Sequence, residues 1–447
     1  MPESPVATTN PCRMCRPLGA CLAFRGIAGS MTLLHGSQGC STYIRRFISS
    51  HYREPVDIAS SALSEKSAVY GGAESLRQGI RNVAERYAPA VLGIATTCLT
   101  ETIGDSVEMI VREMGAGEPL EDVRIIPVST PSYSGSHTEG FHDACVAILR
   151  ELAAGGPGTG AINLFPGFLS PADIRHLKEV MEDFGAPYMV MPDTSETLDG
   201  GIDGTYRRIP DGGTPLESIG QAGRAAFSIE LGMSCAESRS ASAFLEREHD
   251  VSGERLPFPI GLRYSDLFFN AVSEMALAPV PLTYRQERGR LVDAMVDAHK
   301  YLFGRRAVVY GDPDFVIAMT SFLADAGVQP VVCATGGSGP GFAAGMEEAC
   351  SSLGAPPVIL EDADFGQIGE LAAEAGPDLL VGSSKGNHIA RKLGVPLMRA
   401  GFPVHDRIGG QRILHTGYRG AMNLLDILTN MIIAGEEQRL GHGYSYM

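Results

Sequence analysis

The sequence predicts an α/β protein made of three doubly wound, Rossmann-like domains with parallel sheets. Short runs that are apolar throughout recur along the chain, each followed by a Gly, Pro, Asp or Ser turn and a segment of helical length. Such runs are typical of parallel strands that helices cover on both faces. In addition, a chain of 447 residues is too long for a single hydrophobic core, and at about 150 residues per domain it predicts about three domains.

The predicted strands follow one another at intervals that leave room for a helix between them. In chain order they are AVLGIATT (90–97), VRIIPVS (123–129), GAINLFPG (160–167), YMVMPDT (188–194), RAVVYGD (306–312), PVVCATGG (330–337), PVILEDAD (357–364), DLLVGSS (378–384) and PLMRAGFP (396–403). The charged segment 283–304 is strongly helical and leads directly into the strand at 306–312. This alternation predicts βαβ units.

We predict domain boundaries at two segments rich in turn-forming residues. The Gly-rich AAGGPGTG (153–160) closes a first α/β domain, residues 1–157, and SGERLPFPIG (252–261) links a second, 158–258, to the third. Residues 259–447 are predicted to hold a helical connection and the third α/β domain.

Composition excludes several classes of protein. With 44% hydrophobic and 20% charged residues the chain is globular. A net charge of −16 argues against nucleic acid as a partner, because phosphate contacts need clustered Lys and Arg. Neither an N-terminal targeting segment nor an apolar run long enough to cross a membrane is present, so we expect a cytoplasmic protein without a membrane partner.

Three of the nine cysteines have similar surroundings. Cys98 follows a predicted strand and precedes a helical segment, Cys40 ends HGSQGC before another helix, and Cys15 lies in the Pro- and Gly-flanked CRPLGA. In a reducing compartment such cysteines are candidate metal ligands, and backbone N–H groups at a helix start can bind the sulfides of an iron–sulfur cluster. The alternative is that three cysteines fall in turns by chance. Because a four-iron cluster needs four protein ligands, three thiolates require an unconventional ligand or a second polypeptide.

The remaining motifs have simpler interpretations. Cys12 forms a lone C-x-x-C pair with Cys15, which is not specific for one chemistry. His35 is interpreted as orienting the turn beside Cys40. GGSGPG (336–341) lacks the context of a dinucleotide loop, and GDPDF (311–315) reads as a turn with an Asp helix cap. We expect structural roles for five cysteines in apolar or helical contexts, Cys21, Cys145, Cys235, Cys333 and Cys350.

Several motifs, in order, resemble the β-type subunit of component 1 of nitrogenase and of nitrogenase-like reductases. They are CRPLGA, HGSQGC, REP, AVYGG, TTCLTETIGD, TPSYSGSH, ERGRLVDAMVDAH, YGDPDF and GFPVHDRIG…GYRGAMNLL. The resemblance runs from about Asn10 to about Ala434 and implies the nitrogenase component 1 fold. It also implies an α₂β₂ assembly with an α-type subunit, a second β-type subunit and an ATP-dependent, Fe-protein-like reductase as partners.

The resemblance assigns a cofactor to the three cysteines. Cys15, Cys40 and Cys98 match ligands of an 8Fe–7S P-cluster that the α-type subunit completes with three cysteines of its own. Ser132, in TPSYSG, matches a residue that can add an alkoxide ligand when the cluster is oxidised, as a hard oxygen donor would. The catalytic metal cofactor would lie in the partner chain, and no catalytic residue is expected in this one.

Two weaker sites follow from the same resemblance. Asp293 and Asp297, four residues apart on one helix face, together with Glu54 and the backbone carbonyl of Arg53 match positions that hold a cation between two β-type subunits. A solvated acidic helix face is the alternative. Tyr70, in AVYGG, matches an apolar position on the surface where the reductase docks, and simple packing is its alternative.

The implied function is electron relay from the reductase through the P-cluster to the partner's cofactor. The short N-terminus and HDRIGGQR, where molybdenum nitrogenases carry a histidine-rich segment, make the chain look most like methylthio-alkane reductase, which cleaves C–S bonds, or an alternative nitrogenase. A NifN-type cofactor assembly scaffold is a further alternative. Such scaffolds generally lack the first and third cysteines, which are both present here. A chain that keeps the fold only for protein interaction is a non-enzymatic alternative.

Overall fold

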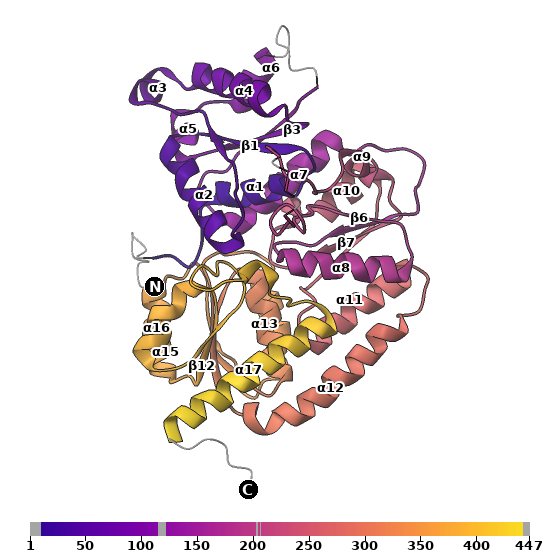
Figure 1. The fold of residues 1–447 in the computed structure, drawn as a ribbon, viewed down its shortest axis with the longest axis vertical. Coiled ribbons are helices and arrows are strands. Elements are labelled where there is room, and N and C mark those ends of the chain that lie inside the picture. Colours follow the sequence, from indigo (N-terminus) through magenta and orange to yellow (C-terminus); the bar gives the residue numbers. More distant parts are fainter. Residues whose placement is uncertain (1–9, 115–121, 203, 206, 441–447) are drawn as a thin grey trace.

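The computed structural model describes residues 10–114, 122–202, 204–205 and 207–440. It contains three sheets, and every pair of neighbouring strands in them is parallel. Figure 1 shows the three corresponding lobes, which follow one another along the chain from indigo through magenta to orange and yellow. The predicted α/β class with parallel sheets is therefore confirmed.

The first sheet has the strand order β2-β1-β3-β4. Its elements are α1 (Arg16–Arg25), β1 (Ser30–His35), α2 (Gln38–Tyr52), β2 (Ala59–Ser60), α3 (Glu65–Tyr70), α4 (Ala73–Tyr87), β3 (Val91–Thr96), α5 (Cys98–Ile103), α6 (Val107–Met114), β4 (Arg124–Val128) and α7 (His137–Leu152). Leu34 packs into one hydrophobic core and its neighbour Leu33 into another, because side chains alternate across a strand. Both faces of this sheet are therefore covered.

The second sheet has the order β6-β5-β7-β8. Its elements are β5 (Ile162–Phe165), α8 (Pro171–Phe184), β6 (Tyr188–Val190), α9 (Leu216–Gly220), β7 (Phe227–Leu231), α10 (Ala241–His249) and β8 (Gly253–Leu256). Strand β8 lies inside 252–261, which the sequence suggested as a linker, so that prediction is wrong for its first half. The strand is partly exposed at the sheet edge and lacks the apolar run by which buried strands are recognised.

The third sheet has the order β11-β10-β9-β12-β13. Its elements are α11 (Gly261–Met275), α12 (Leu282–Leu302), β9 (Arg306–Gly311), α13 (Pro313–Asp325), β10 (Gln329–Thr335), α14 (Phe342–Ala349), β11 (Val358–Leu360), α15 (Phe365–Ala375), β12 (Leu379–Gly382), α16 (Asn387–Leu393), β13 (Leu397–Arg399) and α17 (Gly417–Leu440). Along β9, Ala307 and Val309 enter one core while Val308 and Tyr310 enter the other. Helices α15 and α16 lie on one side of this sheet, and α13 and α17 lie on the other (Figure 1).

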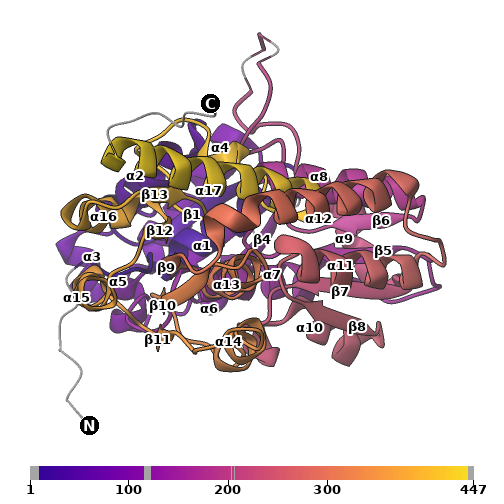
Figure 2. The same cartoon turned by 90° about the horizontal axis from the view of Figure 1, so that it is seen from below.

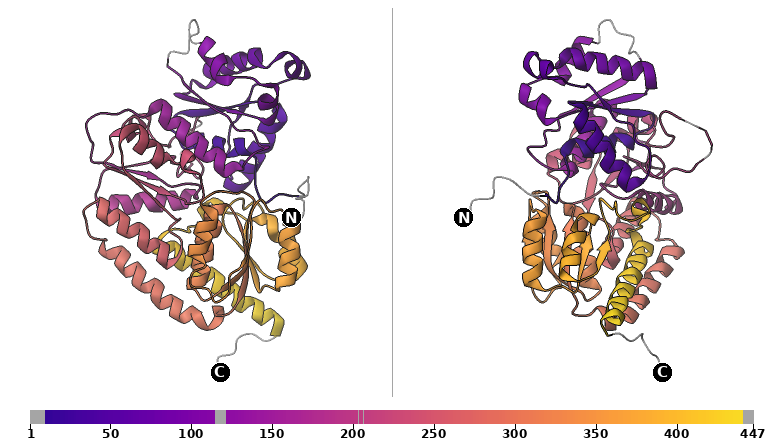
Figure 3. Two further views of the ribbon diagram at one scale, coloured as in Figure 1. Left: turned by 180° about the vertical axis from the view of Figure 1, so that it is seen from behind. Right: turned by 60° about the vertical axis from the view of Figure 1, so that its left-hand side comes forward.

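The three lobes share hydrophobic cores. One core contains residues of the second and third sheets, and another contains residues of the first and second. Figure 3 shows the lobes in contact around a common centre. Helices α12 and α17 pack side by side along the outside of the third lobe (Figure 2). The strands of each sheet fall within one of the three predicted domain ranges, whose boundaries stay a prediction.

Strands β1, β2, β7 and β8 are not among the predicted ones, and each has a polar or very short sequence. Among the described residues, no helix combines the length and the apolar character that a membrane span requires.

Candidate metal-cluster site

The cluster residues suggested by the sequence lie at the carboxyl ends of neighbouring strands. Strands β1 and β3 end side by side, with His35 paired to Thr96, and the chain then reaches Cys40 and Cys98. Strand β4 is the next neighbour of β3, and Ser132 follows it. Because all strands of this sheet are parallel, their carboxyl ends share one edge, where ligand sites of open α/β sheets are found.

Each of the three cysteines lies at the beginning of a helix. Cys15 is the N-cap of α1, Cys40 lies in the first turn of α2, and Cys98 is the first residue of α5. CRPLGA is therefore a helix start, and Pro17 is tolerated there because the first turn has no intrahelical partner for its N–H. The unpaired N–H groups and the positive ends of three helix dipoles favour negative charge at this edge.

The structure brings Cys15, Cys40, Cys98 and Ser132 together. All three cysteines are exposed. Neighbouring atoms nevertheless desolvate the Cys15 thiol and raise its pKa; a hydrogen bond from Ser132 opposes this rise, and the charges of Cys98 and Cys40 add to it. The three sulfur atoms do not form a group within 4.8 Å of one another, as a single ion would need. Their spacing therefore does not fit a single ion.

The surroundings of the thiols are apolar and aromatic on the outer side. Tyr43, Leu99 and Tyr133 are exposed and lie close along the chain to Cys40, Cys98 and Ser132. Lys385, in the third lobe, lies close enough to Cys15 for the two charges to interact. Burial lowers the pKa of Lys385, and the charges of Cys12 and Cys15 oppose this shift. This lysine adds positive charge beside the thiols.

His35 is fully buried and fixes the loops that carry the cysteines. Its Nδ1 lies 2.9 Å from Ser61 Oγ and its Nε2 lies 3.2 Å from an Asp105 carboxylate oxygen. The hydroxyl groups of Thr97 and Thr100 both donate to the His35 carbonyl oxygen, at 3.1 and 3.0 Å, so the ends of β1 and β3 are tied together. Burial lowers the pKa of His35, and Asp105 opposes this shift. The geometry agrees with the positioning role suggested by the sequence.

The residues of the suggested cation site do not meet within one copy of the chain. Arg53 ends α2 in a left-handed conformation, and Glu54 follows it, with its pKa raised by burial and by Asp199. Asp293 and Asp297 are exposed on α12, which lies on another lobe from α2 (Figure 1). Within the described part of the chain, no ligand group closer than 4.8 Å contains any of them. A shared ion would require a second copy.

Tyr70 is the last residue of α3 and is 82% exposed, with Val69 beside it 75% exposed. Its side chain therefore does not pack into the core. It lies in the same lobe as the cysteine-bearing helix starts (Figure 1).

The glycine loop and the Asp turn have packing roles. A Cβ atom at Gly336 would lie 2.2 Å from the Arg13 nitrogen, and one at Gly341 would lie 1.8 Å from the Met233 carbonyl oxygen, so these glycines permit close approach of backbone. Asp312 occupies the N-cap position of α13 as expected, but its side chain makes no cap hydrogen bond. Instead, an Asp312 carboxylate oxygen lies 2.9 Å from His137 Nε2.

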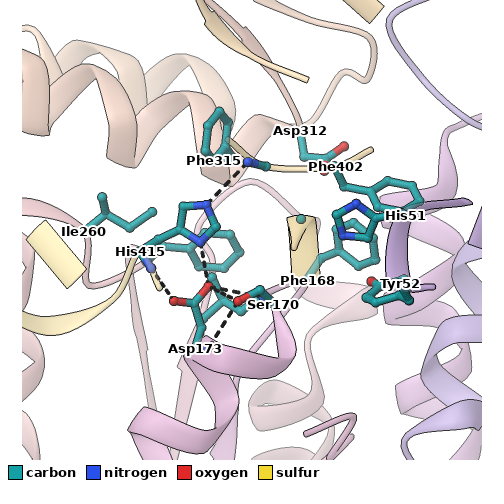
Figure 4. A pocket seen from close by; sticks show the side chains of 14 residues that line it. His51, Tyr52, Phe168, Ser170, Asp173, Ile260, Asp312, Phe315, Phe402 and His415 are labelled. Carbon is teal, nitrogen blue, oxygen red and sulfur yellow. Dashed lines mark hydrogen bonds and ion pairs between the residues drawn. The ribbon is translucent and has the colours of Figure 1, made fainter. Parts of the chain in front are cut away.

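A cavity lies where the three lobes meet, and its lining contains no cysteine (Figure 4). The rings of Phe168 and Phe402 pack edge-on, 5.3 Å apart, beside it. His415, for which no role was suggested by its spacing, places Nδ1 2.8 Å from the buried Asp173. Burial raises the pKa of Asp173, but His415 and the hydrogen bonds from the 415–416 backbone outweigh this, and the net shift is downward.

Comparison with known proteins gives a consistent result. The family profile described as nitrogenase component 1 type oxidoreductase matches residues 15–433. The nitrogenase molybdenum-iron protein β chain of Clostridium pasteurianum is 36% identical over 427 residues, which cover 95% of this chain and 93% of that one. The nitrogenase iron-molybdenum cofactor biosynthesis protein NifN of Bradyrhizobium diazoefficiens is 32% identical over 436 residues, covering 96% and 90%.

A solved structure, nitrogenase Cp1 at pH 6.5, superposes with a TM-score of 0.94 at 34% identity, covering 98% of this chain and 96% of that one. The described chain therefore has the fold that its motifs implied.

Proposed function

Because the chain belongs to the nitrogenase component 1 family of oxidoreductases, as a β-type member, we propose that it relays electrons from an ATP-dependent iron–sulfur reductase to a metal cofactor in an α-type partner. The observation that carries this proposal is the group of three exposed thiols at helix starts on one sheet edge. The chain is thus a subunit of a nitrogenase-family enzyme. We propose an α-type subunit and an iron–sulfur reductase as its partners.

The residues at this edge fit an iron–sulfur cluster shared with a second chain. When bound, such a cluster stores electrons and passes them on. We propose Cys15, Cys40 and Cys98 as this chain's ligands to an 8Fe–7S cluster, with Ser132 placed beside Cys15 to add an oxygen ligand. Thiolates suit iron, and exposed ones leave the remaining coordination to the partner.

The chain's own groups prepare this edge for an anionic cluster. The three thiols lie at the starts of α1, α2 and α5, where helix dipoles are positive, and Lys385 contributes positive charge near Cys15. His35 holds the two loops in register. The exposed aromatic and apolar side chains around the thiols supply area for a partner to cover and so exclude water.

We propose reductive C–S cleavage of methylthio-alkanes as the reaction of the assembled enzyme. The segment HDRIGGQR (405–412), in place of a histidine-rich one, supports this choice. The length of the chain does not support this choice, because the chain covers 93% of the β chain from Clostridium pasteurianum. Reduction of dinitrogen is the second candidate, favoured by the names of the β-chain relatives. Cofactor assembly is a third, favoured by the NifN relative, but the presence of both Cys15 and Cys98 weighs against it.

The cluster assignment is tested with single Cys→Ala variants at positions 15, 40 and 98, each purified without oxygen together with the partner. We expect each variant to lose most of the interfacial cluster iron and its spectral signature, because an iron atom loses its thiolate. Cys21→Ala, on the same helix as Cys15 but buried, is the matched control and should keep its iron. Iron content unchanged in all three variants would overturn the assignment.

The reaction is tested by supplying the complex and its cognate reductase with ATP, and with either small thioethers or dinitrogen. Hydrocarbon released from thioethers, without ammonia from dinitrogen, supports C–S cleavage. Ammonia without hydrocarbon supports the second candidate. Transfer of a cofactor to an apo-nitrogenase, with neither product, supports the third.

A further inference from the structure

We propose that His142, Glu230 and Cys235 form a second metal site, which binds one divalent transition-metal ion of the zinc type. All three residues are buried, and one ligand atom from each lies within 4.8 Å of the other two. Within the described part of the chain, no other group of His, Cys, Asp and Glu side chains meets this condition. The site is separate from the exposed cysteines and does not depend on the proposed electron relay.

The three side chains come from different elements that packing holds in place. His142 lies on α7 and is 4% exposed, Glu230 lies on β7 and is 1% exposed, and Cys235 follows β7 and is 6% exposed. The loop before Cys235 is anchored from the third lobe. There the Asp314 carboxylate accepts hydrogen bonds from Met233 N at 2.7 Å, Ser234 N at 2.9 Å and Ser234 Oγ at 2.7 Å.

Glu230 has one oxygen committed to the protein and one that is less occupied. Its Oε2 accepts hydrogen bonds from Ser242 N at 3.0 Å and Ser242 Oγ at 2.6 Å, and also from the Ser240 hydroxyl. Its Oε1 accepts only a longer bond, from Ala241 N at 3.2 Å, and lies 3.9 Å from His142 Nδ1. Both oxygens thus accept bonds from the start of α10, and the less occupied Oε1 can also be presented to an ion.

A small cavity adjoins the ligand atoms and can hold a further ligand. It is lined by His142 and Cys235, by Thr138 one turn earlier on α7, and by the loop at 338–340, with room for about one water molecule. The Thr138 hydroxyl is buried, with the residue 6% exposed, and has no hydrogen-bond partner among the described residues. An ion-bound water in this cavity would give that hydroxyl a partner, which buried polar groups normally have.

The ligand set selects the kind of ion. Thiolate and imidazole bind zinc and related transition ions, whereas Mg²⁺ and Ca²⁺ take oxygen ligands. Three protein ligands and one water are the usual arrangement of an open tetrahedral zinc site. At bond lengths of ~2.0–2.3 Å the ligand atoms of such an ion lie ~3.3–3.8 Å apart. His142 Nδ1 and Glu230 Oε1, at 3.9 Å, are already close to this spacing, and a pair at the 4.8 Å limit would have to approach by about 1 Å.

Charge at the site is balanced once the Cys235 thiol gives up its proton to solvent. A divalent ion with one thiolate, one carboxylate and a neutral imidazole is neutral overall. Arg255 places Nη2 3.1 Å from Cys235 Sγ, where its charge favours the thiolate and opposes the ion. Asp143, the next residue after His142, is already paired with Arg16 and Arg239 and so is not available as a ligand.

The test uses the full chain with Cys15, Cys40 and Cys98 replaced by Ser, so that exposed thiols do not bind the probe. After removal of metal by a chelator, the chain is titrated with Co²⁺ and then with Zn²⁺. We expect one equivalent of Co²⁺ to bind with a sulfur-to-cobalt charge-transfer absorption, and Zn²⁺ to displace it. Absence of this absorption from the folded chain would overturn the proposal without need of any further variant.

Variants then assign the ligands in the same background. Cys235→Ala should abolish the charge-transfer absorption, and His142→Gln should weaken Co²⁺ binding by roughly tenfold or more. Cys333→Ala is the matched control, since Cys333 is also buried and lies on β10 away from these ligands, and it should bind as the background does. Far-UV circular dichroism shows which variants are folded. A thiolate absorption that persists in folded Cys235→Ala would contradict the assignment.

Discussion

His51 shows how strongly its surroundings control a single side chain. It is enclosed at the centre of the molecule, where its ring packs edge-on against Tyr52 and Phe402. Its Nδ1 accepts a hydrogen bond of 2.9 Å from Val404 N. Burial lowers the pKa of His51 to about 3, so the ring is neutral in the folded protein near neutral pH.

This pKa predicts a dependence of stability on pH. The unfolded state binds a proton at His51 near pH ~6.5, while the folded state resists it down to about 3, so stability falls as pH drops between these values. The contribution approaches ~1.4 kcal/mol per pH unit. We expect His51→Gln to flatten the curve of unfolding free energy against pH, measured with urea, and His388→Gln, at an exposed histidine, to leave it unchanged. Equal slopes in wild type and His51→Gln would contradict the prediction.

Tyr70 permits a second prediction at the scale of one residue. Its ring is almost fully exposed, so removing it costs little folding energy, but it would remove an anchor for the proposed reductase. We expect Tyr70→Ala to raise the reductase concentration needed for half-maximal turnover severalfold, with the same iron content. Ile427→Ala, at an exposed apolar residue on α17, should not change it. Titration of activity with reductase is the measurement, and an unchanged midpoint for Tyr70→Ala would contradict docking at this surface.

Single residues differ in how far the sequence reveals them. Cys15, Cys40 and Cys98 could be singled out because each stands beside turn residues and before a helical pattern. The group of His142, Glu230 and Cys235 could not, because its members are spread over two elements and a loop and converge only in three dimensions. A glutamate between isoleucine and leucine in the short segment FSIEL is the signal that could have drawn attention to it.

Among the elements, α1 and α7 pack most intimately because both have glycine at the contact. A Cβ atom at Gly19 would lie 1.7 Å from the His137 carbonyl oxygen, and one at Gly140 would lie 2.0 Å from that of Arg16. These glycines therefore bring the two helix backbones into direct contact. Cys15 is the N-cap of α1, so this packing also fixes the position of a proposed cluster ligand.

We predict that Gly140→Ala destabilises the protein by about 1–3 kcal/mol through overpacking, despite the higher helix propensity of alanine. The matched control is Gly435→Ala in α17, where no atom lies within 4 Å of the new Cβ; it should be neutral or slightly stabilising. Thermal unfolding followed by circular dichroism compares the two. A Gly140→Ala protein as stable as wild type would show that the helices can separate without cost.

Strands that are both buried and apolar were predicted from the sequence, and the missed strands carry polar residues. Strands such as VLGIAT (β3) and LLVG (β12) are apolar and buried throughout, and such runs were recognised. Strand β1, SMTLLH, is equally buried but half polar, since Ser30 and His35 find hydrogen bonds inside the protein. The sequence cannot show which groups these polar side chains bond to, because Phe24 and Ser61 lie six and 26 residues away along the chain. Strand β8, GERL, lies at an edge and carries charge.

For the molecule as a whole, the acidic face of α12 is the clearest candidate for contact between two copies. Asp293 and Asp297 project from it, exposed, and Val296 between them is 72% exposed. Arg53 caps α2, which lies on another lobe (Figure 1), and Glu54 follows it. We propose that a cation joins these two regions from different β-type chains, and carboxylate and carbonyl oxygens suit such an ion.

We predict that Asp293→Asn/Asp297→Asn favours αβ halves over the α₂β₂ assembly, and that a chelator does the same to the wild-type complex. Light scattering coupled to size exclusion gives the assembly mass. Glu370→Gln/Glu374→Gln, an exposed pair with the same spacing on α15, is the control and should assemble as wild type does. If the variant and the chelator-treated complex both remain α₂β₂, the cation is not needed for assembly.

The exposed thiols have a consequence for how the protein must be produced in a cell. Until a companion covers them, Cys15, Cys40 and Cys98 stand open to oxidants and stray metal ions. Exposed Tyr43, Leu99 and Tyr133, close along the chain to Cys40, Cys98 and Ser132, are apolar surface that would also adhere to other newly made chains. On the cluster assignment proposed above, we expect the chain to fold well only when its partner, iron and sulfide are supplied together and oxygen is excluded.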